Sequence, residues 1–143
     1  MMRHFATIPL TIIPLILYLL VAFSYGSLAG HPDVWDEGWL NFTLMSGGKF
    51  TLLNEHLALI VGLICLFFEI WKATRQTSQE AFDQVFSMLV FIIYLVLFIT
   101  VAKCSHAVFF LLMLISLIDV VAGFLVSLRS ARRSLAVESN IAP

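Results

Sequence analysis

The chain is poor in charged residues. Only 12% of its 143 residues are charged, whereas 61% are hydrophobic, and the formal net charge is −1. A soluble domain of this length has too small an interior to bury that much apolar surface. A nearly neutral chain also lacks the basic patch typical of nucleic-acid-binding proteins, so no nucleic-acid partner is expected. The composition therefore predicts a single integral membrane domain over residues 1–143, with the lipid bilayer as its main partner.

Cysteine is scarce as well, and no familiar catalytic motif is present. Cys65 and Cys104 lie in or beside apolar segments and form no CxxC pair, which excludes a disulfide framework and a thiol-redox motif. The sequence also lacks a Ser-His-Asp elbow, paired catalytic carboxylates and a glycine-rich phosphate loop. We therefore expect a protein that is not an enzyme and that holds no cofactor.

Long apolar runs are what the sequence has in abundance. A membrane-spanning helix needs about 20 mainly apolar residues. The windows of that kind cover roughly residues 5–28, 51–72, 84–102 and 107–128. Because only residues 103–106 separate the last two windows, those helices must turn back on each other. The predicted fold class is an all-α membrane protein, a bundle of four transmembrane helices.

The first apolar run has a second interpretation. Basic Arg3, the apolar stretch and the small residues around Ala29 resemble a secretory signal with its cleavage site. The stretch is longer than the apolar core of a typical signal, so we expect an uncleaved first helix. Pro9 is expected in an early turn, and Pro14 at a kink.

The positions of Lys and Arg predict the orientation. Cytoplasmic loops of membrane proteins carry an excess of these residues. The residues that would share one side are Arg3, Lys72, Arg75, Arg129, Arg132 and Arg133. Only Lys49 and Lys103 fall on the other side. We therefore expect a multi-pass protein of a bacterial inner membrane, with both termini cytoplasmic. Residues 129–143 are expected to form a cytoplasmic tail that is unstructured after Arg133.

The outer segment, residues 29–50, carries its own pattern. Trp35 and Trp39 are suited to the headgroup region of a membrane. Hydrophobic and polar residues alternate on both sides of Gly47 and Gly48, which predicts a short β-hairpin. We expect this hairpin to lie as a flap on the outer end of the bundle.

Small and polar residues form a stripe on each of two helices. Membrane helices associate through such stripes, because lipid provides no hydrophobic drive between them. The stripe of the second helix consists of Glu55, Ala58, Gly62, Cys65 and Glu69. That of the fourth helix consists of Ser116, Asp119, Ala122, Gly123 and Ser127. We expect the stripes to face each other, with Gly62 opposite Asp119, and Glu69 to pair with Lys72 three residues later.

Asp119 is the most unusual residue, since it lies in the middle of an apolar helix with no Lys or Arg within two turns. The first interpretation is a protonated acid that helps to pack the helices by hydrogen bonding to Ser116 or to a tyrosine. Tyr18 and Tyr94 are the candidates, because both are expected at a similar depth. The alternative is a proton or ion site, which acids inside membranes often mark.

His56, Cys104 and His106 gather at the expected outer end. Imidazole and thiolate groups bind zinc or copper, but the spacing of these residues matches no metal motif, so no metal is expected. The first functional hypothesis is a non-enzymatic accessory or scaffold subunit that works as a homo-oligomer or with other membrane subunits. The alternatives are a small oligomeric transporter or channel that uses Asp119, and a metal- or cofactor-binding protein of the outer face.

Overall fold

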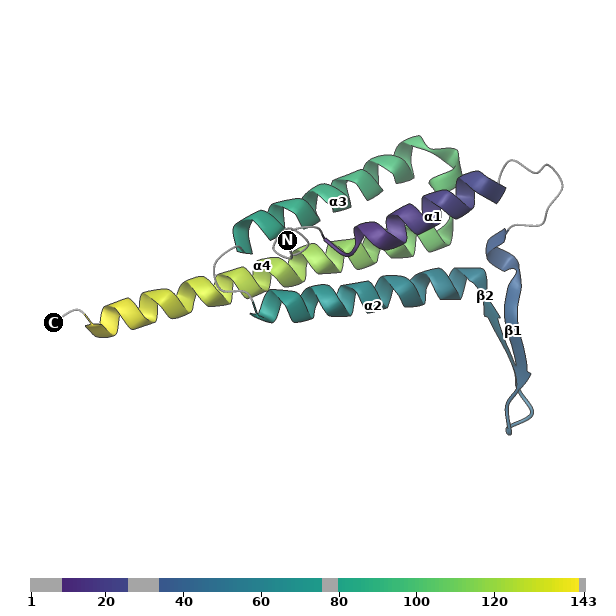
Figure 1. The fold of residues 1–143 in the computed structure, drawn as a ribbon, viewed down its shortest axis with the longest axis horizontal. Coiled ribbons are helices and arrows are strands. Elements are labelled where there is room, and N and C mark those ends of the chain that lie inside the picture. The colour runs from purple at the N-terminus through teal and green to yellow at the C-terminus, as the bar shows by residue number, and fades with distance from the viewer. Residues whose placement is uncertain (1–8, 26–33, 76–79, 142–143) are drawn as a thin grey trace, which may run out of the picture.

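The computed structural model describes residues 9–25, 34–75 and 80–141. In these ranges the chain forms four α-helices and one two-stranded antiparallel sheet (Figure 1). In chain order the elements are α1 (Ile12–Tyr25), β1 (Gly38–Thr43), β2 (Lys49–Leu53), α2 (Asn54–Arg75), α3 (Glu80–Thr100) and α4 (Ala107–Ile141). Short 3-10 turns cover Val34–Asp36 and Ala102–Cys104.

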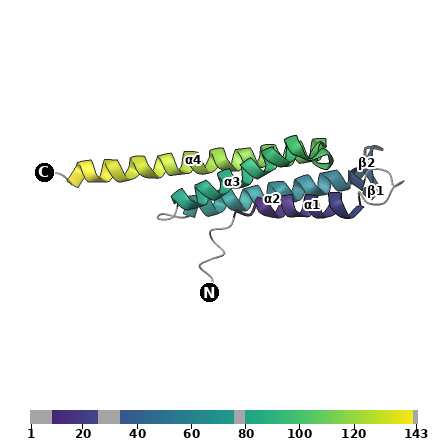
Figure 2. The same ribbon diagram turned by 90° about the horizontal axis from the view of Figure 1, so that it is seen from above.

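The helices form an elongated bundle in which α4 packs against the other three. Figure 1 shows α2 and α3 on either side of α4, and Figure 2 shows α4 along one edge of the bundle. Helix α1 packs against α2 and α4. The β-hairpin and the Ala102–Cys104 turn lie at one end, which we call the hairpin end. At the opposite end α2 stops, α3 begins, and α4 continues past its neighbours. Each helix therefore runs antiparallel to the next one in the chain.

Two helices are long and apolar enough to cross a membrane. In the part of the chain that the structure describes, these are α2 and the first 23 residues of α4, Ala107–Arg129. The apolar parts of α1 and α3 are shorter, Ile12–Ser24 and Gln84–Thr100. The predicted helical fold with one small hairpin is confirmed, and two of its helices have the length and composition of membrane spans.

The first helix starts later than the sequence suggested. Pro9–Thr11 form a turn, in which the Ile12 amide donates to the Pro9 carbonyl at 3.2 Å. Pro14 then falls in the first turn of α1, where backbone N–H groups have no acceptor within the helix. Its missing N–H therefore removes no helical hydrogen bond, and the kink expected at Pro14 has no cause. The sequence placed Pro9 in an early turn of this helix, and the structure shows it in the turn that precedes α1.

The last helix ends later than expected. The residues after Arg133 were predicted to be an unstructured end, but α4 continues to Ile141. The segment from Ser134 to Ile141 contains neither Gly nor Pro. Extending an existing helix is far easier than starting one, since the costly first turn is already formed. The prediction failed because a position near the end of the sequence was taken as a sign of disorder.

The hairpin is confirmed, with a different placement. Phe42 pairs with Phe50 and Thr43 with Lys49, and Gly47 takes the positive φ of 80° that the turn requires. The β-hairpin does not cover the bundle as a flap, because it leaves the hairpin end steeply to one side (Figure 1). The reason is the connection, since β2 passes at Leu53 directly into α2, whose start is therefore Asn54 rather than residue 51.

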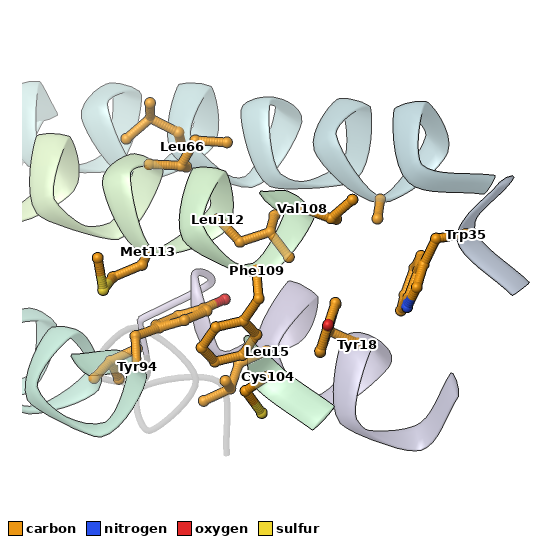
Figure 3. Close-up of a cluster of buried hydrophobic side chains, with 13 residues drawn as sticks. Leu15, Tyr18, Trp35, Leu66, Tyr94, Cys104, Val108, Phe109, Leu112 and Met113 are labelled. Atoms are coloured by element: carbon orange, nitrogen blue, oxygen red, sulfur yellow. The ribbon is translucent and has the colours of Figure 1, made fainter. Parts of the chain in front are cut away.

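Aromatic rings fill the interior near the hairpin end (Figure 3). The ring of Tyr18 stacks on Trp35 at 4.6 Å between centroids and contacts Phe109 at 4.8 Å, and Tyr94 contacts Phe109 at 5.3 Å. Trp35 is thus only 6% exposed, so its ring packs inside the bundle rather than on its surface. The Val34–Asp36 turn places its ring on α1. Trp39, in β1, is 70% exposed.

Candidate functional site

Hydrogen-bonding side chains from all four helices meet around Asp119. We call this set the polar cluster, and its members are Thr11, Glu69, Lys72, Ser87 and Asp119. The Asp119 side chain projects from α4 and is buried. The Thr11 hydroxyl donates to Asp119 Oδ2 at 3.5 Å, and the Ser87 hydroxyl of α3 also hydrogen-bonds the carboxyl. Asp119 therefore links the start of α1 with α3 and α4.

Glu69 brings α2 into the polar cluster. Its buried carboxylate accepts a hydrogen bond through Oε1 from the Leu10 amide, in the turn that precedes α1. Its other oxygen lies 3.7 Å from Lys72 Nζ, which confirms the predicted pair. The turn before α1 has an unpaired amide because a helix cannot satisfy its first N–H groups. Glu69 supplies the missing acceptor from a neighbouring helix.

Asp119 does not stand alone as a charged group. Both Glu69 and Lys72 interact with it electrostatically, the first as a like charge and the second as an opposite one. Within two turns of Asp119, α4 itself carries no Lys, no Arg and no second acid. The packing of α2 against α4 brings an acid, Glu69, and a base, Lys72, close to Asp119. Two carboxyl groups near one ammonium group inside an apolar bundle make an arrangement that can bind a proton or a small cation.

The hydrogen-bond partners predicted for Asp119 are wrong. The Tyr18 hydroxyl donates to the Lys103 carbonyl at 3.0 Å, near the hairpin end. The Tyr94 hydroxyl donates to the Thr11 carbonyl at 3.2 Å, so Tyr94 reaches the polar cluster only through the Thr11 backbone. Tyr18 was placed too deep because α1 was expected to reach residue 28, whereas the helix ends at Tyr25.

Ser116 was expected to bind Asp119 as well. Its hydroxyl is buried and has no hydrogen-bond partner among the described residues. Ser116 precedes Asp119 by three residues, so both lie on the same face of α4. An unpaired buried hydroxyl next to the polar cluster leaves one donor and its lone pairs available on the side toward the hairpin end.

The small residues of the two stripes allow close helix packing. On α2, the residues Ala58, Gly62, Cys65 and Glu69 are buried, as predicted. A Cβ at Gly62 would lie 2.8 Å from Leu112 Cδ2 and 3.2 Å from Ile115 Cδ1. Gly62 thus faces α4, but about one turn from Asp119 toward the hairpin end.

Gly123 faces α3 and not α2. The Gln84 side chain lies over this glycine, where a Cβ would clash with it, and Gln84 Nε2 donates to the Val120 carbonyl at 2.8 Å. The sequence did not predict Gln84, Ser87 and Thr11 as members of a buried site. Each is a single polar residue in or at the end of an apolar window, and this signal does not distinguish a buried position from a solvated one.

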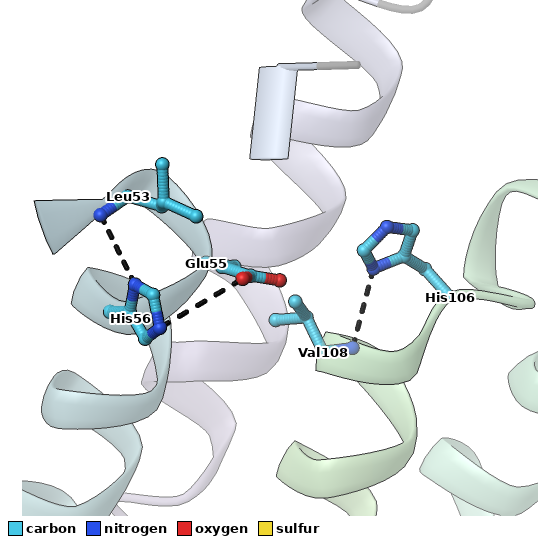
Figure 4. A network of polar contacts seen from close by, with 5 residues as sticks. All are labelled: Leu53, Glu55, His56, His106 and Val108. Carbon is cyan, nitrogen blue, oxygen red and sulfur yellow. Dashed lines mark hydrogen bonds and ion pairs between the residues drawn. The ribbon is translucent and has the colours of Figure 1, made fainter. Parts of the chain in front are cut away.

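The candidate metal ligands at the hairpin end do not form a metal site. Figure 4 shows His56 and His106 on different helices, each bonded to nearby backbone. His56 Nδ1 accepts from the Leu53 amide at 3.1 Å, and His106 Nδ1 from the Val108 amide at 3.3 Å. Cys104 is fully buried, and burial raises the pKa of its thiol. Among the described residues, no three His, Cys, Asp or Glu side chains are placed to hold a metal ion.

The polar cluster is therefore the strongest candidate for a functional site among the described residues. It brings Thr11 from the turn before α1, Glu69 from α2, Ser87 from α3 and Asp119 from α4 into one buried group, with Lys72 at its edge. Its function has to be argued from its chemistry and from the surface around it. Comparisons of the chain with protein-family models, with curated proteins and with solved structures gave no match.

Proposed function

We propose that the chain is a non-enzymatic accessory or scaffold subunit of a bacterial inner membrane, which spans it with all four helices. The observation that carries the proposal is the large apolar surface that the bundle exposes around an interior that also contains polar groups. Besides the apolar core, the buried residues include polar or charged Thr11, Glu69, Ser87, Ser116 and Asp119, and large apolar side chains are exposed along every helix. The exposed ones include Ile16, Leu20 and Phe23 in α1, Phe67 and Phe68 in α2, Ile92 and Ile99 in α3, and Ile118 and Phe124 in α4.

This distribution suits a lipid environment. In water, exposed apolar surface on this scale would drive aggregation. Burying polar groups that lack hydrogen-bond partners would not stabilise the fold there. In lipid, the exposed residues meet acyl chains, and the polar groups find partners in the bundle interior. The described part of α1, Ile12–Tyr25, has 14 residues and is shorter than the other three helices.

The charges support one orientation. Lys72, Arg75, Arg129 and Arg132 lie at the end where α2 stops and α4 continues, opposite the hairpin end. The positive-inside rule places that end in the cytoplasm together with both termini. The hairpin end then faces outward.

The small interior of the bundle and its apolar outer surface support a role as a subunit. The interior is filled by side chains from four helices, which leaves little room for a private substrate cavity. The groove that the structure shows along Ile16, Leu19, Leu20 and Phe23 lies on the surface of α1, away from Asp119. An apolar perimeter that surrounds the whole bundle can contact other membrane helices at several places. The proposed partners are further copies of the chain or other membrane subunits.

The proposal is tested by purifying the tagged chain in native lipid nanodiscs and weighing the particles by native mass spectrometry. We expect particles with several copies of the chain, or with a second protein at fixed stoichiometry that a tag on that protein also recovers. An unrelated tagged four-helix membrane protein of similar abundance is the control. Particles that contain a single copy of this chain and no other protein would contradict the accessory or scaffold role.

A specific observation supports a second candidate, a small proton or cation transporter. The carboxyl groups of Asp119 and Glu69 interact inside the bundle beside Lys72, and the Ser116 hydroxyl next to them is unpaired. Acids that interact in an apolar interior bind protons or cations to reduce their repulsion. The sequence alone had offered one acid, which makes a poor relay.

The second candidate is tested with purified protein in vesicles that contain a pH-sensitive dye, under an imposed potential. A transporter of this kind moves protons or a cation, and Asp119→Asn removes the flux while the helix content and oligomeric size stay unchanged. Glu55→Gln is the matched control, because Glu55 lies at the hairpin end beside His56. Flux equal to that of empty vesicles, or equal in Asp119→Asn and the native chain, would exclude this role.

A further inference from the structure

The β-hairpin has one apolar face and one polar face. Cross-strand partners point to the same side of a two-stranded sheet, and successive residues alternate between its sides. One face carries the pairs Leu40–Leu52 and Phe42–Phe50, and the other carries Asn41–Thr51 and Thr43–Lys49. The rings of Phe42 and Phe50 lie 5.0 Å apart, in agreement with this assignment. The hairpin is therefore amphipathic over its paired residues, 40–43 and 49–52.

The apolar face is not covered by the bundle. Leu40, Phe42 and Phe50 are exposed, and so are Leu44 and Met45 in the turn at the tip. Hairpin tips that face water usually carry polar turn residues, and an isolated two-stranded hairpin is only marginally stable in water. An arm with an apolar face and an apolar tip needs an apolar surface against which to lie.

The direction of the arm indicates which surface this is. The hairpin leaves the bundle steeply sideways from the start of α2 (Figure 1), so it runs along the membrane plane if the helices cross the bilayer. Its root is the point where β2 passes into α2, beside the exposed apolar side chains of that helix. The apolar face is thus a continuation of the lipid-facing surface of the bundle at the level of the headgroups.

We propose that the hairpin is a membrane-interface arm, whose apolar face and tip lie on the outer leaflet at the boundary between headgroups and acyl chains. The inference rests on the proposed membrane-spanning function. Aromatic residues, here the two phenylalanines, favour that boundary, while the polar face with Lys49 meets water and lipid phosphate.

A lipid surface fits this face better than a second protein does. A stable protein interface buries about 800 Å² on each partner, and four side chains with a short tip provide much less. Binding to a lipid boundary has no such threshold, because each apolar group that enters adds to the free energy independently. The arm also widens the footprint of a narrow bundle on one side, which would fix its rotation and tilt in the membrane.

The test measures collisions of spin labels with oxygen, which is enriched in the acyl region, and with a water-soluble nickel complex. Labels are attached in the Cys65→Ala/Cys104→Ala background, in lipid vesicles, at Leu40→Cys and Phe42→Cys on the apolar face. Asn41→Cys and Thr51→Cys are the matched positions on the polar face. We expect oxygen to dominate at the first pair and nickel at the second, so that the ratio reverses from one residue to the next.

Two results would contradict the proposal that the hairpin is a membrane-interface arm. Equal nickel access on both faces would mean that the hairpin stands in water. Protection of the apolar face from both reagents would mean that protein, either a second copy or a partner, covers it. A label at Ile118→Cys in α4 separates these failures from that of the proposed function, since oxygen dominates there only if α4 lies in lipid.

Discussion

The two halves of the bundle interior contain different kinds of side chains. Near the hairpin end, the rings of Tyr18, Trp35 and Phe109 fill the space by stacking. Toward the opposite end, the same four helices meet through the polar cluster around Asp119. Aromatic packing tolerates small shifts between helices, whereas hydrogen bonds and buried charges require defined partners. The comparison suggests that the aromatic half provides stability and the polar half fixes which helices meet, and in what register.

Tyr94 joins the two halves. Its ring contacts Phe109 in the aromatic half, and its hydroxyl donates to the Thr11 carbonyl beside the polar cluster. One side chain of α3 thus contacts both the packing of α4 and the non-helical turn that begins α1. A change at Tyr94 should show how strongly one half depends on the other.

The largest expected effect is the loss of an aromatic ring. Phe109 is fully buried between Tyr18 and Tyr94, and Phe109→Ala should lower the free energy of unfolding by about 3–5 kcal/mol by leaving a cavity. Phe110→Ala is the control, because the neighbouring ring is exposed, and it should cost about 1 kcal/mol or less. Titration with sodium dodecyl sulfate in mixed micelles, followed by circular dichroism, measures both. Equal losses would mean that the aromatic half is not the stabilising one.

The sequence predicted the parts of this fold that depend on local patterns. Apolar windows gave the helices, alternation around Gly47 gave the hairpin, and small residues gave the buried face of α2 with Gly62 and Glu69. Each of these signals repeats at the period of the element that it describes, so no knowledge of the neighbours is needed. The Glu69–Lys72 pair belongs to the same class, because three residues separate its members within one helix.

The contents of the polar cluster could not be predicted in the same way. Whether Thr11 or a tyrosine reaches Asp119 depends on where α1 begins and how far it is shifted along α4. A displacement of one residue moves a side chain by 1.5 Å along the axis and turns it by about 100°. The turn at Pro9–Thr11 and the end of α1 at Tyr25 set that shift, and neither has a unique sequence signal. Helix stripes were therefore predictable, whereas hydrogen-bond partners between helices were not.

An intermediate effect is expected where α2 and α3 approach α4 closely. Gly62→Ala should cost about 1–3 kcal/mol, because the new methyl group would press on Leu112 and Ile115, which are themselves buried. Gly123→Ala in the polar half should displace the end of the Gln84 side chain and cost about 1 kcal/mol through the lost bond to Val120. The same titration compares the two variants. A larger loss at Gly123 would show that the polar half is the more tightly packed.

The smallest expected effect tests the link between the halves. Tyr94→Phe keeps the ring against Phe109 but removes the donor to the Thr11 carbonyl, so it should cost about 1 kcal/mol. Tyr18→Phe is the matched variant, since its hydroxyl donates to the Lys103 carbonyl near the hairpin end. If Tyr94 holds the start of α1, hydrogen exchange at the amides of Ile12, Ile13 and Leu15 should become faster in Tyr94→Phe and stay unchanged in Tyr18→Phe. Equal exchange in both variants would mean that Glu69 and Asp119 hold that turn without the tyrosine, and that the two halves of the bundle are energetically independent.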